Sequence, residues 1–74
     1  MNEDEFYQKL GKQIKLLREN AHLTQEKLAE KSGISLDYLG KSEVNINKPG
    51  LKTLLKISNA LNLPLKKLFD FKEV

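Results

Sequence analysis

Two stripes of apolar residues with helical spacing dominate the pattern of this chain. Phe6, Leu10, Ile14 and Leu17 follow one another at intervals of four, four and three, which places them on one face of a helix over about 3–20. A second stripe consists of leucines at 51, 54, 55 and 61 together with Ser58, and it predicts another helix over about 51–62. Each stripe leaves a polar opposite face, so both helices are expected to cover one shared core.

Two shorter helices are predicted between these stripes from their end signals. Thr24 and Ser35 are good N-cap residues. An apolar residue precedes each cap and another lies four positions into each helix, the spacing of a hydrophobic staple. Gly33 suits the left-handed position that ends a helix. The expected helices therefore cover about 25–32 and 36–44.

The remaining segments predict a loop, a fifth helix and a tail. Asn, Pro and Gly make 45–50 a loop. Pro64 suits a helical first turn, so a short fifth helix is expected over about 65–70, followed by a flexible tail at 71–74. The expected fold is all-α: five helices in one compact domain over 1–74, with no internal repeat.

Composition narrows the possible chemistry. With 74 residues, no cysteine and one histidine, the chain offers no disulfide, no Cys-based zinc site and no pair of imidazoles. No catalytic constellation is evident, so neither an enzyme, a cofactor nor a metal is expected. The acidic N-terminus is unlike a signal peptide and no apolar run could span a membrane, which predicts a cytoplasmic protein.

Charge is divided unevenly along the chain. Residues 1–37 hold six Lys/Arg and seven Asp/Glu, whereas residues 38–74 hold seven Lys and three Asp/Glu. A basic second half is compatible with a polyanionic partner such as DNA. A solvated lysine surface explains the same excess equally well.

The segment LTQEKLAEKSGIS at 23–35, followed by YLGKSE at 38–43, carries the strongest motif. Together with LGKQIKLLREN before it and LKTLLKISNALNLPLKKLF after it, this stretch resembles the lambda-repressor/Cro-like (XRE) family. The resemblance covers about 10–69 and implies a DNA-binding helix-turn-helix in the helices 25–32 and 36–44. In that arrangement the second helix enters the major groove of DNA.

The resemblance also implies which residues touch double-stranded DNA. Gln25 would contact a phosphate and brace the recognition helix, and four positions would face the groove: Leu36, Asp37, Gly40 and Lys41. Along the phosphates beyond that helix would lie Val44, Asn45, Asn47 and Lys48. Leu36 offers only apolar contact, for example to a thymine methyl, and Asp37 can accept from cytosine but repels phosphate, so Lys41 is the one clear donor.

Two further positions are expected to support the structure. Arg18, the only arginine, is expected to form a salt bridge, with Glu26 or Glu30 as candidate partners. Ser42 stands where the family usually places a large apolar residue. We expect its hydroxyl to bond back to a carbonyl one turn earlier.

These features favour a sequence-specific transcriptional regulator of the bacterial or phage type, most simply a repressor or autoregulator. Such proteins act as homodimers on near-palindromic operators. The candidate dimer residues are the apolar ones near the C-terminus: Leu65, Phe69, Phe71 and Val74. The alternative is a protein-interaction module, such as an antitoxin or adaptor with weak DNA binding, and an exposed Leu16 and Leu36 would suit it.

Overall fold

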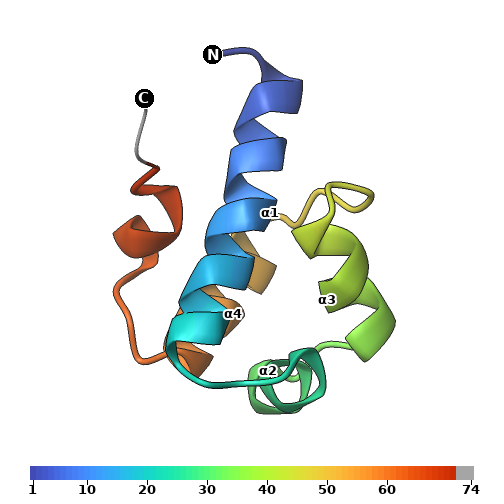
Figure 1. Cartoon of the computed structure of the whole chain (residues 1–74), viewed down its shortest axis with the longest axis vertical. Helices are drawn as coiled ribbons and strands as arrows, with labels where there is room; N and C mark the ends of the chain where they lie inside the picture. The colour runs from blue at the N-terminus through green and yellow to red at the C-terminus, as the bar shows by residue number, and fades with distance from the viewer. Residues whose placement is uncertain (72–74) are drawn as a thin grey trace.

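The computed structural model describes residues 1–71 and contains four α-helices followed by a short 3-10 segment (Figure 1). The elements are α1 (Glu3–Asn20), α2 (Gln25–Ser32), α3 (Leu36–Glu43), α4 (Leu51–Ala60) and the 3-10 helix η1 (Leu65–Phe69). α1 packs against α3 on one side and η1 on the other, while α2 packs against α3 and α4. Residues 1–71 contain no strand, and none of their helices is long and apolar enough to cross a membrane.

The predicted N-caps are confirmed. The Thr24 hydroxyl accepts a hydrogen bond from the Lys27 amide at 3.1 Å, and the Ser35 hydroxyl accepts one from the Tyr38 amide at 3.0 Å. Each cap satisfies one of the amides that a first helical turn leaves without a partner. Both helices of the central pair therefore begin where the sequence predicts.

The four α-helices end in the same way. Each is followed by one residue with positive φ, and these residues are His22, Gly33, Asn45 and Asn62. The next amide along the chain then donates to a carbonyl five residues back, in the bonds Leu23 to Arg18, Ile34 to Ala29, Ile46 to Lys41 and Leu63 to Ser58. This is the Schellman bond, which turns the chain sharply out of each helix.

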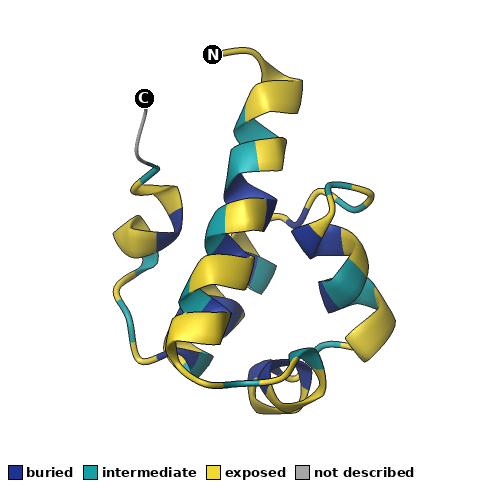
Figure 2. Cartoon of the chain, in the orientation of Figure 1, coloured by how far each residue is buried: buried dark blue, intermediate teal, exposed yellow. Residues whose placement is uncertain are grey.

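One continuous core joins all five elements. Six large side chains in it are fully buried: Leu10, Ile14, Leu28, Leu39, Ile57 and Leu68. In Figure 2 the buried residues lie on the inward faces of the helices. The second predicted stripe is only partly inward, because Leu51 and Leu55 are exposed and Ile57 is fully buried. Ser42 is also buried, and its hydroxyl donates to the Tyr38 carbonyl at 2.8 Å, which confirms the expected bond one turn back.

The predicted fifth α-helix is wrong in type. The five residues Leu65–Phe69 form a 3-10 helix, and no side chain caps its start at Pro64. So short a segment gains too few α-helical bonds to offset the cost of starting a helix. Two other ends differ slightly, since α3 ends at Glu43 and α4 at Ala60.

Phe71 is the one residue of the predicted tail that the structure describes. This residue is partly buried against the core, and its ring centroid lies 5.7 Å from that of Phe6. An aromatic pair of this kind gains both buried area and edge-to-face attraction. The rest of the predicted tail, 72–74, lies outside the described residues.

Candidate nucleic-acid interface

An open hollow of about 600 Å³ lies on the surface where α2 and α3 meet. Its lining residues are Gln25, Leu36, Asp37, Gly40, Lys41 and Val44. All six belong to the set that the resemblance assigns to DNA contact. The start of α2 and the exposed side of α3 thus contribute to one continuous surface.

The exposed side of α3 is electrically balanced. Asp37 and Lys41 lie one turn apart, and the Lys41 ammonium is 3.0 Å from the Asp37 carboxylate. Both side chains are open to solvent, with 74% of Asp37 and 47% of Lys41 exposed. Exposed pairs of this kind contribute about 0–1 kcal/mol, so either partner can exchange its contact for another ligand.

A buried charged network fixes the inner side of α3 to α1. The Arg18 guanidinium donates to both Glu43 oxygens, at 2.7 and 3.1 Å, and to the Leu23 carbonyl at 2.8 Å. The hydrogen bond to Glu43 raises the pKa of Arg18 above its ordinary value, against the opposing effect of burial. Arg18 is therefore a permanent cation that joins three segments of the chain.

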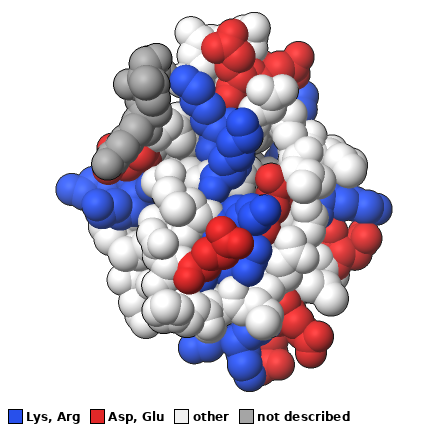
Figure 3. All heavy atoms as spheres, in the orientation of Figure 1, with Lys and Arg blue, Asp and Glu red and all other residues white. Residues whose placement is uncertain are grey.

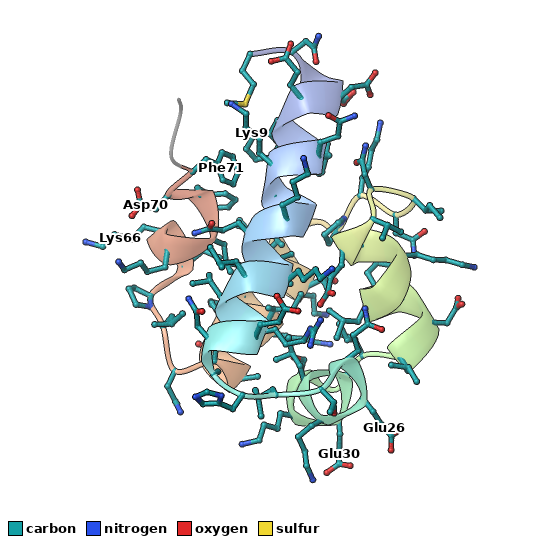
Figure 4. The ribbon with its side chains drawn as sticks, viewed as in Figure 1. Lys9, Glu26, Glu30, Lys66, Asp70 and Phe71 are labelled. Carbon is teal, nitrogen blue, oxygen red and sulfur yellow. The ribbon has the colours of Figure 1, made fainter. Side chains whose placement is uncertain are left out.

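This network corrects the predicted partners of Arg18. Glu26 and Glu30 both lie on α2, and Figure 4 shows their side chains directed away from the molecule. Both are exposed, whereas the Glu43 side chain is only 1% exposed and faces the guanidinium. Because α1 packs directly on α3, the carboxylate 25 residues away is the near one.

Gln25 is part of the same network. Its amide nitrogen donates to Glu43 Oε1 at 3.0 Å. Its amide oxygen faces Gly40, where an added Cβ would lie 3.5 Å away. The Gln25 side chain therefore lies between the two helices and braces α3 from α2.

The predicted residues beyond α3 are more dispersed. Asn45, which lies two residues after α3, adopts the left-handed conformation with a φ of 66°. The Asn47 amide donates to the Lys41 carbonyl at 3.1 Å. Lys48 turns back to α1, where its ammonium is 3.6 Å from Asp4 and 5.6 Å from the centre of the Tyr7 ring. None of the residues Asn45, Asn47 and Lys48 lines the hollow.

The candidate dimer residues are in mixed environments. Leu65 and Phe71 are partly buried against the core. Phe69 is 37% exposed, and its ring stacks on Phe6 with centroids 6.0 Å apart. Val74 lies outside the described residues.

A second groove, between α1 and the end of α3, contains residues that the sequence analysis did not single out. It has a volume of about 470 Å³ and is lined by Gln8, Lys12, Lys15, Glu43, Val44 and Asn45. The three residues from α1 are spaced at four and three, so a polar stripe at helical spacing is the signal that could have identified them. Residues 1–71 contain no group of acidic, His or Cys side chains able to hold a metal ion.

Comparison with known proteins identifies the family to which the chain belongs. A helix-turn-helix family model (HTH_3) matches residues 14–68, which is more than half of the chain. The chain belongs to the helix-turn-helix family of DNA-binding transcriptional regulators. The family match thus includes α2, α3 and all six residues that line the hollow.

Relatives and solved structures of helix-turn-helix proteins agree with this assignment. An uncharacterised HTH-type transcriptional regulator of Mycobacterium tuberculosis is 37% identical over 59 residues, which cover 80% of this chain but 42% of that protein. The crystal structure of the restriction-modification controller protein C.AhdI from Aeromonas hydrophila is 33% identical, with a TM-score of 0.84 over 85% of this chain and 96% of that one. SinR, solved in complex with DNA, is 32% identical, with a TM-score of 0.78 over 82% of this chain and 98% of that one.

Proposed function

We propose that this helix-turn-helix domain represses transcription by placing α3 in the major groove of a specific DNA site. The observation that carries the proposal is the hollow at the α2–α3 junction, which is lined by the six residues that the resemblance assigns to DNA contact. A helix fits the major groove, where each base pair presents a distinct pattern of donors, acceptors and methyl groups. The solved DNA complex of the similar SinR supports the same use of the fold.

The exposed side chains of α3 set the kind of base readout that we propose. Leu36 is 47% exposed and offers an apolar surface to a thymine methyl. Lys41 is the donor, to a guanine edge or a phosphate, once it exchanges the Asp37 carboxylate for DNA. Gly40 has no side chain, which leaves room for DNA to come close to the α3 backbone.

Contacts to the phosphates would fix the orientation of α3 in the groove. Gln25 stands at the first turn of α2, where free amides and the helix dipole favour an anion. Asn45 and Asn47 follow α3, and Lys48 would reach a phosphate by releasing Asp4. Phosphate contacts of this kind position the protein, and base contacts select the sequence.

We infer that the functional unit is a homodimer on a near-palindromic operator in the cytoplasm. Two helix-turn-helix units bind half-sites about one helical turn apart when their twofold axis coincides with that of the DNA. Phe69 offers the most exposed of the described apolar surfaces among the candidate dimer residues. Measuring the molar mass in solution over a range of protein concentrations, with and without the operator, would test this pairing.

Selection of bound duplexes from a random DNA library at near-physiological salt tests the proposed function. The expected result is a pseudo-palindrome with half-sites about one turn apart. Recovery of an unpaired single site would support specific binding and overturn the dimer. A flat pool would overturn specific DNA binding and favour the protein-interaction module.

A further inference from the structure

We propose that the groove between α1 and the end of α3 is a second phosphate-binding surface, in which Lys12 and Lys15 hold the DNA backbone beside the major-groove contact. This inference rests on the proposed function, because it extends the DNA-binding surface beyond the helix-turn-helix. It assigns a DNA contact to α1, where the resemblance implies none.

The groove and the α2–α3 hollow are neighbours on the surface. Val44, the residue that ends α3, lines both of them. Figure 1 shows α1 and α3 side by side, and contacts between them hold the groove's two walls together. A polyanion lying over the exposed side of α3 would therefore come close to the groove at Val44.

The groove contains positive charge without a local counterion. Lys12 and Lys15 are exposed and form no ion pair with any residue in 1–71, whereas Lys41 is paired with Asp37 and Lys48 with Asp4. In the space-filling view, Lys and Arg atoms lie along the upper and middle part of this face, with Asp and Glu atoms among them near the centre (Figure 3). The net positive charge next to the hollow thus comes from α1, because Asp37 balances the charge of Lys41 on α3.

The one carboxylate of the groove does not cancel that charge. Glu43 is buried and is already held by the Arg18 guanidinium at 2.7 Å and by the Gln25 amide at 3.0 Å. Gln8 adds an uncharged amide one turn before Lys12. Two ammonium groups and an amide on consecutive turns of one helix suit successive phosphates of a nucleic-acid strand, which carry one charge each.

The test compares two double variants that remove the same charge. Lys12→Ala/Lys15→Ala removes the groove lysines. Lys31→Ala/Lys66→Ala removes two exposed lysines that also form no ion pair within 1–71 and line neither the groove nor the hollow. Lys66 lies on η1, on the opposite side of α1 from α3 (Figure 4).

The readout is the affinity for a random-sequence duplex across a range of salt concentrations. Each phosphate contact contributes about 0.9 to the slope of log affinity against log salt, so the groove variant should lose about 1.8. The control variant should keep the wild-type slope. Shortening the duplex until the flanking phosphates are absent should lower the wild-type slope and leave that of the groove variant unchanged.

The outcomes separate this inference from the proposed function. If the wild type shows no salt-dependent duplex binding, the proposed function and the inference both fail. If it binds, and the groove variant keeps its slope or loses no more than the control, only the inference is overturned, and the two lysines face an acidic protein or solvent. Because both lysines are exposed, equal thermal unfolding midpoints are expected, and Lys12→Gln/Lys15→Gln repeats the test if the alanine variant is less stable.

Discussion

The two sides of α3 each carry one ion pair, and the two pairs have opposite environments. On the inner side, Arg18 and Glu43 are 2.7 Å apart, with only 10% and 1% of their side chains exposed. On the outer side, Lys41 and Asp37 are 3.0 Å apart and largely exposed. Removing one partner of a buried pair leaves an uncompensated charge and costs about 3–5 kcal/mol, whereas an exposed pair contributes about 0–1 kcal/mol. The inner pair fixes where α3 lies, and the outer pair is free to be replaced by DNA.

Breaking the inner pair is expected to have the largest effect on stability. Glu43→Ala leaves the Arg18 guanidinium buried and removes the acceptor of Gln25, so the free energy of unfolding should fall by about 3 kcal/mol. For a domain of this size that lowers the melting temperature by about 12–24 °C, measured by circular dichroism. Glu30→Ala is the matched control, because its pair with Lys27 is exposed and 3.8 Å long, and it should cost less than about 1 kcal/mol. Similar losses in both variants would contradict the comparison.

Separating α1 from α3 should have the next largest effect. A Cβ at Gly11 would lie 2.6 Å from the Ser42 carbonyl oxygen and 2.8 Å from that of Glu43, and both are backbone atoms. Gly11→Ala should therefore destabilise the domain by about 2 kcal/mol, although alanine favours a helix more than glycine does. Urea denaturation measures the change. A gain in stability would show that α1 can move away from α3 at little cost.

Changing the outer pair should alter DNA affinity and leave stability nearly unchanged. Asp37→Asn removes the charge that repels phosphate and releases Lys41, so affinity for a duplex should rise by about fivefold, or about 1 kcal/mol. Lys41→Ala should act in the opposite direction and lower the salt slope by about 0.9. Fluorescence anisotropy with a labelled duplex measures both. A fall in affinity with Asp37→Asn would instead identify Asp37 as a base-reading acceptor.

The smallest expected change is at Gly40, the glycine on the outer side of α3. A Cβ there would lie 3.5 Å from the Gln25 amide oxygen, an ordinary contact. Gly40→Ala should stabilise the domain by about 0.5–1 kcal/mol, the opposite sign to Gly11→Ala. Duplex affinity should fall if DNA approaches the α3 backbone at this position. Unchanged affinity would place Gly40 outside the contact.

Much of the local structure could be predicted because its causes lie within a few residues of each other. The caps at Thr24 and Ser35 bond amides three positions later, and the apolar stripes repeat within each helix. Of the four left-handed residues that end the helices, only Gly33 was predicted. His22, Asn45 and Asn62 were not, because these residue types adopt positive φ only where the surrounding chain requires it.

The candidate site also has one part that was predicted and one part that was not. The residues that line the α2–α3 hollow could be named in advance only from the resemblance to the lambda-repressor/Cro-like family. The pairing of Lys48 with Asp4 and the groove of Lys12 and Lys15 could not. Both depend on how α1 packs against the end of α3 and the loop that follows it.

The sequence by itself determined the four α-helices and where each begins, since hydrogen bonds and apolar periodicity act over short separations. Only the tertiary structure decided which carboxylate Arg18 binds. The two predicted partners, Glu26 and Glu30, have the same chemistry as Glu43. The packing of α1 on α3 brings Glu43 within 2.7 Å of Arg18, while Glu26 and Glu30 remain in solvent. Long-range packing of this kind follows from the shapes of all the buried side chains together, and no short segment of the chain contains it.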